Sequence, residues 1–297
     1  MVADRPSRLV LDSPSLIYRA FYALPRSLTD PQGVPVNAVR GYLDMLSRLL
    51  VDQRPAAVVN VLDADWRPQW RVDRYPGYKA TRREDPPELP GQLPRIREVL
   101  DAAGLPVAEA AGYEADDVIG TIAAAAGPDE RIAVVTGDRD LFQVVRDPVV
   151  WVLYPLKGTS SLARMDAAAV AAKAGVPPDR YVDLAILRGD PSDGLPGVAG
   201  VGEKTATRLL AEFGDLDGLL AAGERLPRRL AAALERSRDY IQAMRGIVPV
   251  ATGLAYEASP ARPPDRERLA ALADRYGLDG PVGRLLAACE TAGLAGP

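Results

Sequence analysis

The chain has 297 residues, of which 47% are hydrophobic and 26% charged, which is ordinary for a globular protein of one to three domains. It contains no histidine and a single cysteine, Cys289, which excludes Ser-His-Asp and Cys-His catalysis, a zinc site built from Cys and His, and an intramolecular disulfide. The net charge of -4 argues weakly against a nucleic-acid partner, because domains that bind nucleic acids are usually basic.

Strands and helices alternate through the first half of the sequence. Apolar runs predict strands over residues 8–12, 56–63, 105–108, 132–138 and 149–153, and helical spacing predicts helices over 36–51, 93–103 and 115–126. This alternation predicts an α/β fold, with a mostly parallel sheet that helices cover on both faces. After about residue 165 the strand signal stops, and we expect helices, with a small helical appendix from residue 260 onward.

No apolar run approaches the ~20 residues that span a membrane, and the N-terminus has no secretory apolar core. We therefore expect a cytoplasmic protein without a membrane partner.

Residues 66–90 differ in composition from both the α/β part and the helical part, because they combine five prolines with six basic residues. We expect a long excursion from the sheet, with a helix over 78–84 that would place Lys79 and Arg82 on one face. Lys and Arg side chains suit phosphate oxygens and developing negative charge. A solvated basic loop explains the charge equally well.

Three of the predicted strands end in aspartate, at Asp12, Asp63 and Asp138. Carboxyl ends of parallel strands meet at one edge of a sheet, which is where α/β proteins bind ligands. A turn or a helix cap explains any one of these residues, but three together favour a site.

Further acidic residues follow these strands, and they are Glu114, Asp116, Asp117, Asp140, Asp190 and Asp193. The helix macrodipole accounts for one or two acids at the start of the helix that opens at Glu114, but not for three. Crowded carboxylates repel one another unless protons or cations neutralise them. Without histidine or cysteine, Mg²⁺ or Mn²⁺ is the natural partner, and two ions ~4 Å apart could support phosphodiester cleavage.

A glycine-rich turn follows the last two aspartates. Gly197, Gly200 and Gly202 lead into a predicted helix that begins near Lys204 and Thr205. Glycines allow a phosphate to approach the backbone N–H groups of a helix N-terminus, although the spacing is not that of a P-loop. A simple helix–helix turn remains an alternative.

Five blocks, in order, resemble the bacterial 5'→3' exonuclease and flap endonuclease family, which includes the N-terminal nuclease domain of DNA polymerase I. They are LVLDSPSLIYRAFYALP, RYPGYKATR, YEADDVIGT, VTGDRDLFQVV and LRGDPSDGLPGVAGVGEKTATRLL, and the resemblance extends over about residues 9–248.

The resemblance implies a PIN-like catalytic domain over residues 1–175, with an arch or gateway segment at 66–90. A helical DNA-binding subdomain would follow over 176–297, with a helix-three-turn-helix at 197–205 that grips duplex backbone and binds K⁺. The nine carboxylates named above would form a two-metal cluster, and Lys79 and Arg82 would contact the scissile phosphate beneath a helical arch. The implied activity is that of a monomeric, stand-alone 5' nuclease acting on DNA flaps, nicks and 5' ends. RNA-primed DNA is a further candidate substrate.

Two positions depart from the family pattern. The usual Asp-Gly-His opening is Asp12-Ser13-Pro14, and the usual Asn after Ser-Asp is Gly194. The first change keeps the acidic residue but removes a histidine that could handle the DNA end. Three aromatic residues, Tyr18, Phe21 and Tyr22, are candidates for base stacking, but their spacing suits core packing better.

Three alternatives remain open. A PIN-type ribonuclease would share the acidic sheet edge but would not require the glycine turn. A haloacid-dehalogenase-like phosphatase would need Asp-x-Asp on the first strand, where residue 14 is proline. A non-catalytic junction-binding protein would tolerate the loss of carboxylates, and none of the nine is missing. Without these nine the remaining chain is mildly basic, which removes the objection raised by the net charge.

Overall fold

The computed structural model describes residues 5–157 and 159–294, and a seven-stranded sheet lies at its centre. The strand order is β6-β5-β4-β1-β2-β3-β7; the five central strands are parallel, and the two edge strands are antiparallel. The strands are β1 (Arg8–Asp12), β2 (Ala57–Val61), β3 (Val107–Glu109), β4 (Ile132–Val135), β5 (Val150–Lys157), β6 (Ser161–Met165) and β7 (Glu257–Ala258).

Thirteen α-helices accompany this sheet within the described residues. They are α1 (Ser13–Ala23), α2 (Asn37–Gln53), α3 (Gln69–Arg74), α4 (Leu93–Ala102), α5 (Ala115–Ala125), α6 (Ala167–Ala174), α7 (Tyr181–Arg188), α8 (Glu203–Phe213), α9 (Leu216–Leu220), α10 (Arg228–Arg236), α11 (Arg238–Met244), α12 (Arg266–Tyr276) and α13 (Asp279–Ala292). None of them is long and apolar enough to cross a membrane, as far as the described part of the chain extends.

The central strands separate two hydrophobic cores, because their side chains alternate between the two faces of the sheet. Val10 of β1 belongs to the core with α5 and α7, whereas its neighbours Leu9 and Leu11 belong to the core with α1, α2, α4 and α13. Strands that are buried on both faces read as continuous apolar runs, which is why the sequence reveals them.

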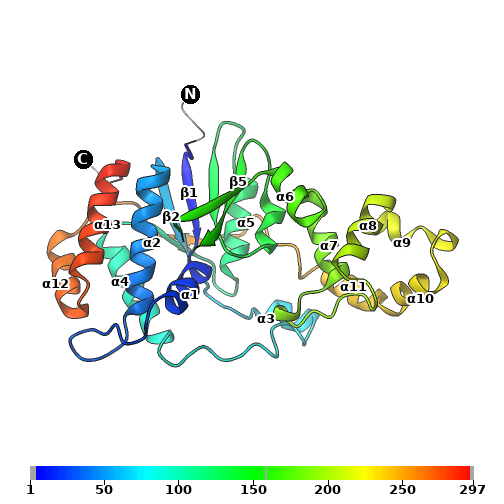
Figure 1. The fold of residues 1–297 in the computed structure, drawn as a ribbon, viewed down its shortest axis with the longest axis horizontal. Coiled ribbons are helices and arrows are strands. Elements are labelled where there is room, and N and C mark those ends of the chain that lie inside the picture. The colour runs from blue at the N-terminus through cyan, green and yellow to red at the C-terminus, as the bar shows by residue number, and fades with distance from the viewer. Residues whose placement is uncertain (1–4, 158, 295–297) are drawn as a thin grey trace.

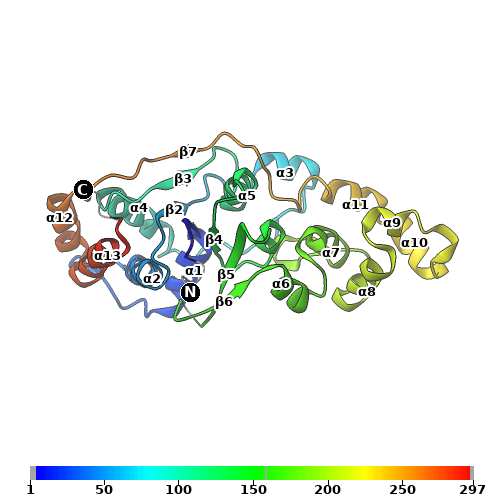
Figure 2. The same cartoon turned by 90° about the horizontal axis from the view of Figure 1, so that it is seen from above.

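The helical part, α6 to α11, extends from one end of the sheet and makes the molecule elongated (Figure 1). The chain then returns along the sheet, where β7 pairs with β3, and ends in α12 and α13. These two helices pack on α4 and α2, at the end of the molecule opposite α10 (Figure 2). Thus α12 and α13 belong to the α/β part of the molecule, and not to the helical subdomain in which the sequence predicts them. Val282 and Leu285 of α13 are buried in the core of the α/β part.

Two further expectations about elements are wrong. The strands do not end at residue 165, because the chain adds the edge strand β7. This strand has only two residues, one of them charged, and is too short to give a strand signal in the sequence. Residues 78–81 form turns and residues 82–84 are irregular, so this segment is not a helix. Lys79 has a positive φ of 50°, a conformation that an α-helix does not allow. The helix of this segment is α3, which lies before Lys79, so Lys79 and Arg82 do not share a helical face.

Candidate active site

The ends of β1, β2 and β4 bring three carboxylates to one edge of the sheet. In-register pairing aligns Asp12 with Val61, the last residue of β2, and aligns its neighbour Leu11 with Val135, the last residue of β4. The Thr136 hydroxyl donates to Asp12 Oδ2 at 2.5 Å and accepts from the backbone N–H of Asp138 at 2.8 Å. Asp63 accepts from the N–H of Ala115, the first residue of α5, at 2.7 Å. Hydrogen bonds thus join the three strand ends to one another or to the neighbouring helix.

Asp116, Asp140 and Asp193 extend this group, as the shifts in their pKa values show, and Asp190 belongs to it because its charge acts on Asp140 and Asp193. Burial raises the pKa of Asp12 to about 7, although the bond from Thr136 opposes the shift. Burial, followed by the charges of Asp138 and Asp12, raises the pKa of Asp116 well above its ordinary value.

The pKa values of Asp140 and Asp193 are raised in the same way. Burial raises the pKa of Asp140, and the charges of Asp138 and Asp190 raise it further. Burial also raises the pKa of Asp193, which Lys79 partly offsets. We call the seven residues that share this field the acidic cluster, and they are Asp12, Asp63, Asp116, Asp138, Asp140, Asp190 and Asp193.

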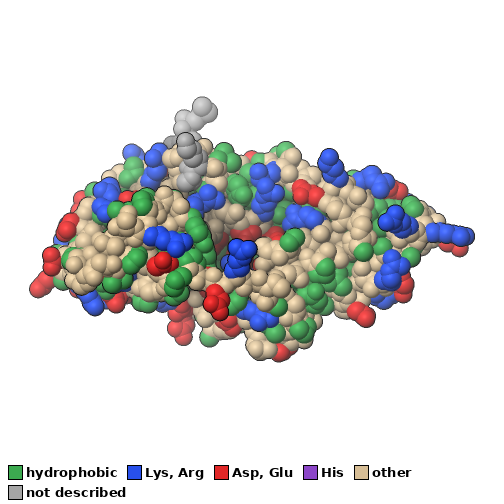
Figure 3. All heavy atoms as spheres, turned by 60° about the horizontal axis from the view of Figure 1, so that its bottom comes forward, with side chains coloured by type: hydrophobic (Ala, Val, Ile, Leu, Met, Phe, Trp, Pro, Cys, Tyr) green, Lys and Arg blue, Asp and Glu red, His purple; other side chains and the backbone are tan. Residues whose placement is uncertain are grey.

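The acidic cluster borders an open cleft of about 520 Å³, which Asp138, Asp140, Asp190 and Glu203 help to line. Figure 3 shows acidic side chains in a recess near the middle of one face, with Lys and Arg side chains around it. Within the described residues, no three acidic side chains already converge closely enough to hold a metal ion. The donor set still fits one, because it consists of oxygen atoms only and carries negative charge that nearby basic residues compensate only in part.

Glu114 and Asp117 have different surroundings from the acidic cluster. They form a capping box at the start of α5, and Asp117 is fully buried. Arg71 binds both residues, with 2.7 Å to Glu114 Oε2 and 2.7 and 2.8 Å to the two oxygens of Asp117. Ala251 donates a further backbone bond to Asp117. The structure therefore commits Asp117 to Arg71 rather than to the cleft, contrary to its expected place among the metal ligands.

Arg71 is the residue that sequence reasoning missed. Its side chain is 3% exposed, and its guanidinium lies 4.4 Å from the centre of the Trp70 ring. In the sequence it is one of six basic residues in a proline-rich segment, and no spacing distinguishes it. Only the fold shows that α3 carries it beneath the N-terminus of α5.

Lys79 and Arg82 lie beside the carboxylates, as expected, although not on a helix. Lys79 Nζ donates to Glu114 Oε1 at 2.5 Å and to the Trp66 carbonyl at 3.3 Å. Arg82 is exposed, and its charge acts on both Asp63 and Asp193. Lys79 and Arg82 thus place two cations beside the carboxylates Glu114, Asp63 and Asp193.

Gly194 holds residues 66–90, which we call the basic segment, in place. The Lys79 N–H donates to the Asp193 carbonyl at 2.9 Å. A Cβ atom on Gly194 would lie 2.5 Å from the Gly77 carbonyl oxygen, and its φ is 72°. The departure at this position therefore has a structural reason, because only glycine permits both the backbone conformation and the close approach.

The glycine-rich turn connects α7 to α8. The backbones of Gly189 and Gly197 are so close that a Cβ on either would lie 2.5 Å from backbone atoms of this turn. Gly200 and Gly202 face open space, and Gly202 caps α8. Lys204 is exposed in the first turn of α8, and Thr205 is half-buried. Backbone N–H groups at this helix start are accessible to an anion.

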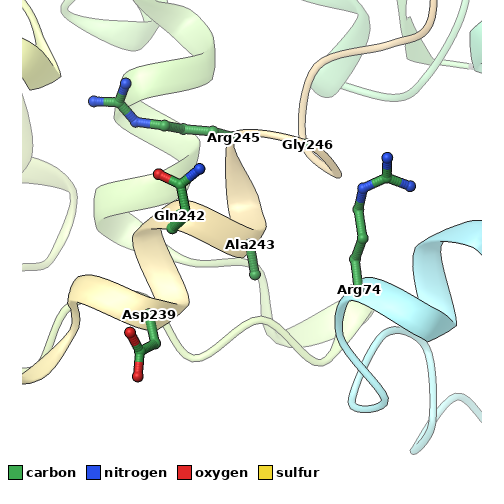
Figure 4. Close-up of a pocket in the computed structure, with 6 residues that line it drawn as sticks. All are labelled: Arg74, Asp239, Gln242, Ala243, Arg245 and Gly246. Carbon is green, nitrogen blue, oxygen red and sulfur yellow. The ribbon is translucent and has the colours of Figure 1, made fainter.

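Two other features lie outside the acidic cluster, namely the aromatic residues of α1 and a second cleft. Phe21 is buried in the core, whereas Tyr22 is 66% exposed and Tyr18 is half-buried and donates to Asp85. Figure 4 shows a second cleft, of about 500 Å³, between α3 and α11. Its Arg74 and Arg245 point in different directions, and Arg245 is paired with Asp217.

Comparisons with known proteins relate both parts of the chain to one family. A model described as the N-terminal resolvase-like domain of 5'-3' exonucleases matches residues 7–175, and one described as their C-terminal SAM fold matches residues 176–267. The chain is 48% identical to a 5'-3' exonuclease of Streptomyces coelicolor, across 94% of this chain and 98% of the relative. It is 44% identical to a 5'-3' exonuclease of Mycobacterium tuberculosis, across 97% and 99%. DNA polymerase I of Mycobacterium bovis is 42% identical, but the match covers only 29% of that protein.

Solved structures share the fold at low sequence identity. A bacteriophage T5 flap endonuclease in complex with DNA and metal ions has a TM-score of 0.66 and 17% identity, across 96% of this chain and 99% of that one. The catalytic core of Rad2 in complex with DNA substrate has a TM-score of 0.60 and 18% identity, across 96% and 92%. The α/β fold with a following helical part is thereby confirmed.

Proposed function

Because the chain belongs to the 5'-3' exonuclease family, we propose that it is a divalent-metal-dependent 5' nuclease that hydrolyses DNA at flaps, nicks and 5' ends. We place this activity in the cytoplasm, in the replication and repair of DNA. The proposal depends above all on the acidic cluster, which borders an open cleft and has Lys79 and Arg82 beside its carboxylates. Such an arrangement suits an ion-dependent reaction on a phosphodiester.

The chain's own groups divide the work of this reaction. The acidic cluster, with Glu114 at its edge, would hold two Mg²⁺ or Mn²⁺ ions, which supply an activated water and neutralise the leaving oxygen. Lys79 and Arg82 orient the scissile phosphate and offset the charge that develops on it. Thr136 fixes the orientation of Asp12, and Arg71 keeps Glu114 within reach of Lys79.

The glycine turn supports the binding of duplex DNA in this proposal. Gly200 and Gly202 leave room for a backbone phosphate, while Gly197 packs the turn onto the end of α7. Lys204 and Thr205 follow in the first turn of α8 and add a charge and a hydroxyl. Carbonyl oxygens of the same turn are donors for K⁺.

Replacing Lys204 with alanine is expected to weaken DNA binding about equally for all sequences and to reduce the slope of log affinity against log salt by about 1. Fluorescence anisotropy in EDTA, with Arg275→Ala on distant α12 as a charge-matched control, measures both quantities. An unchanged salt slope would remove Lys204 from the interface.

The exchange Gly194→Ala is expected to lower the cleavage rate by about tenfold to a hundredfold. The new methyl group would push the Gly77 carbonyl away and shift both Lys79 and Asp193, and small misplacements of catalytic groups are costly. Single-turnover rates measure the effect, with Gly283→Ala as the control, because a Cβ at that position meets no atom within 4 Å. Equal rates for the two variants would contradict the role of this contact.

Metal binding is expected to stabilise the protein more at pH 7.5 than at pH 5. The folded-state pKa of Asp12 is about 7, against an ordinary value of 3.8, so the folded protein binds the proton more tightly than the unfolded chain. Stability without metal should therefore fall as the pH rises from about 4 to 7, and Asp116 and Asp140 shift in the same direction. Thermal unfolding in EDTA and in Mg²⁺ at both pH values tests this; equal metal-induced shifts in Tm would contradict it.

One comparison of substrates distinguishes this proposal from its rivals. A 5'-labelled DNA flap and a single-stranded RNA of the same sequence are incubated with the protein and Mg²⁺. We expect release of the DNA flap and slower cleavage of the RNA. Preferred cleavage of the RNA would favour a PIN-type ribonuclease, and tight binding of the flap without cleavage would favour a non-catalytic junction-binding protein.

A further inference from the structure

Trp66 is an exposed aromatic side chain at the border of the acidic cluster. It follows Asp63 by three residues, and half of its side-chain surface, 50%, is exposed. Its carbonyl oxygen accepts from Lys79 Nζ at 3.3 Å, and the same ammonium reaches Glu114 at 2.5 Å. The backbone of Trp66 is therefore tied to one of the two cations that we assign to the scissile phosphate.

The second cation lies against the Trp66 ring. The Arg82 guanidinium centre is 5.9 Å from the centre of this ring and 6.0 Å from the centre of the Tyr18 ring. Tyr18 comes from α1 and donates to Asp85, which joins that helix to the basic segment. Arg82 thus stands between two aromatic rings that belong to different elements, and the indole still presents open surface to solvent.

These positions combine the two chemistries that single-stranded nucleic acid requires. Cations next to the cluster can hold phosphate, and a flat exposed ring offers a surface on which a base stacks. Core packing does not explain an indole that remains half exposed with the guanidinium of Arg82 beside its ring.

We propose that Trp66 stacks on an unpaired nucleobase next to the phosphate that Lys79 and Arg82 hold, and so makes the enzyme select a 5' strand that carries a base at this position. The inference rests on the proposed nuclease function and adds a specificity residue to the same site. Trp66 binds the substrate in this account and takes no part in the chemical step.

The test compares two flap substrates that differ at the unpaired nucleotide next to the junction, which is either adenosine or an abasic residue. We expect Trp66→Ala to lower kcat/KM on the adenosine flap by about tenfold and to leave the abasic flap unchanged. Trp66→Phe should keep most of the preference for the base. Tyr256→Ala, which removes another exposed aromatic side chain near β7, should behave as the wild type.

A fluorescent readout that needs no cleavage accompanies the rates. With 2-aminopurine in place of the adenosine and EDTA present, wild type and Trp66→Phe should quench the fluorescence, and Trp66→Ala should not. An equal loss on both flaps would overturn the proposal, because it would show that Trp66 acts only by supporting Arg82. Unchanged rates and quenching in Trp66→Ala would overturn it as well.

Failure of the proposed function gives a different result. A wild-type protein that leaves both flaps intact in Mg²⁺ and in Mn²⁺ contradicts the nuclease assignment. The quenching by wild type, compared with Trp66→Ala, then still decides whether the ring stacks on the base.

Discussion

Asp116→Asn is expected to reduce flap cleavage on the order of 10³-fold and, at the same time, to raise the Tm of the metal-free protein. Asp116 lies where burial and the charges of Asp138 and Asp12 oppose its ionised form. The amide removes one negative charge from this repulsive group, which stabilises the fold, but it also removes an anionic oxygen ligand from the site. A gain in stability with a loss of activity is the signature of a functional site that is strained by its own charge.

Cleavage rates with Mg²⁺ and thermal unfolding in EDTA measure the two effects, and DNA binding in EDTA should remain close to that of the wild type. Asp129→Asn is the matched control, because this exposed residue precedes β4 and lies toward the opposite edge of the sheet. A variant that retains full turnover would show that Asp116 is not part of the metal site.

Arg71→Met is expected to have the largest effect on folding, a loss of about 3–5 kcal/mol in the free energy of unfolding. Arg71 is the buried cation between Glu114 and Asp117, whose side chains are 6% and 0% exposed. Its removal would leave the buried Asp117 without a cationic partner, while Glu114 would keep only Lys79. Arg71→Lys should recover only part of the loss, since an ammonium cannot bind both oxygens of Asp117 in the planar, bidentate manner of a guanidinium.

Urea unfolding of the four variants Arg71→Met, Arg71→Lys, Arg71→Met/Asp117→Asn and Asp117→Asn tests this expectation. The double variant Arg71→Met/Asp117→Asn should be more stable than Arg71→Met, because it removes the charge of Asp117 that the loss of Arg71 leaves unpaired. A loss below about 1 kcal/mol in Arg71→Met would contradict the importance of the cluster around Arg71. Asp117→Asn alone is expected to destabilise the fold, because it breaks the ion pair with Arg71. Replacing a residue that only binds a metal ion would not have this effect.

The sequence predicts the central strands well because β1, β2 and β4 are largely buried and appear as apolar runs, interrupted in β2 only by Asn60. The position of Asp12 and Asp63 at the carboxyl edge follows from this, because parallel strands in register end together. The edge strand β7 gives no such signal, since pairing with β3 defines it and its two residues are exposed.

The missed features depend on tertiary contacts. A helix over 78–84 is compatible with local spacing, but the positive φ of Lys79 and its backbone bond to the Asp193 carbonyl require a turn. Asp117 looks like any other member of an acidic block until Arg71 is placed 2.7 Å from it. No sequence pattern joins these two residues, which are 46 positions apart.

The cleavage of a 5'-labelled DNA flap under single-turnover conditions tests the central claim most directly. Wild-type protein and Asp116→Asn are each assayed with Mg²⁺ and with EDTA. The account predicts release of the labelled flap only by the wild type and only with Mg²⁺. Cleavage by the wild type in EDTA, or equal cleavage by both proteins in Mg²⁺, would contradict the assignment of the acidic cluster as a metal-dependent nuclease site.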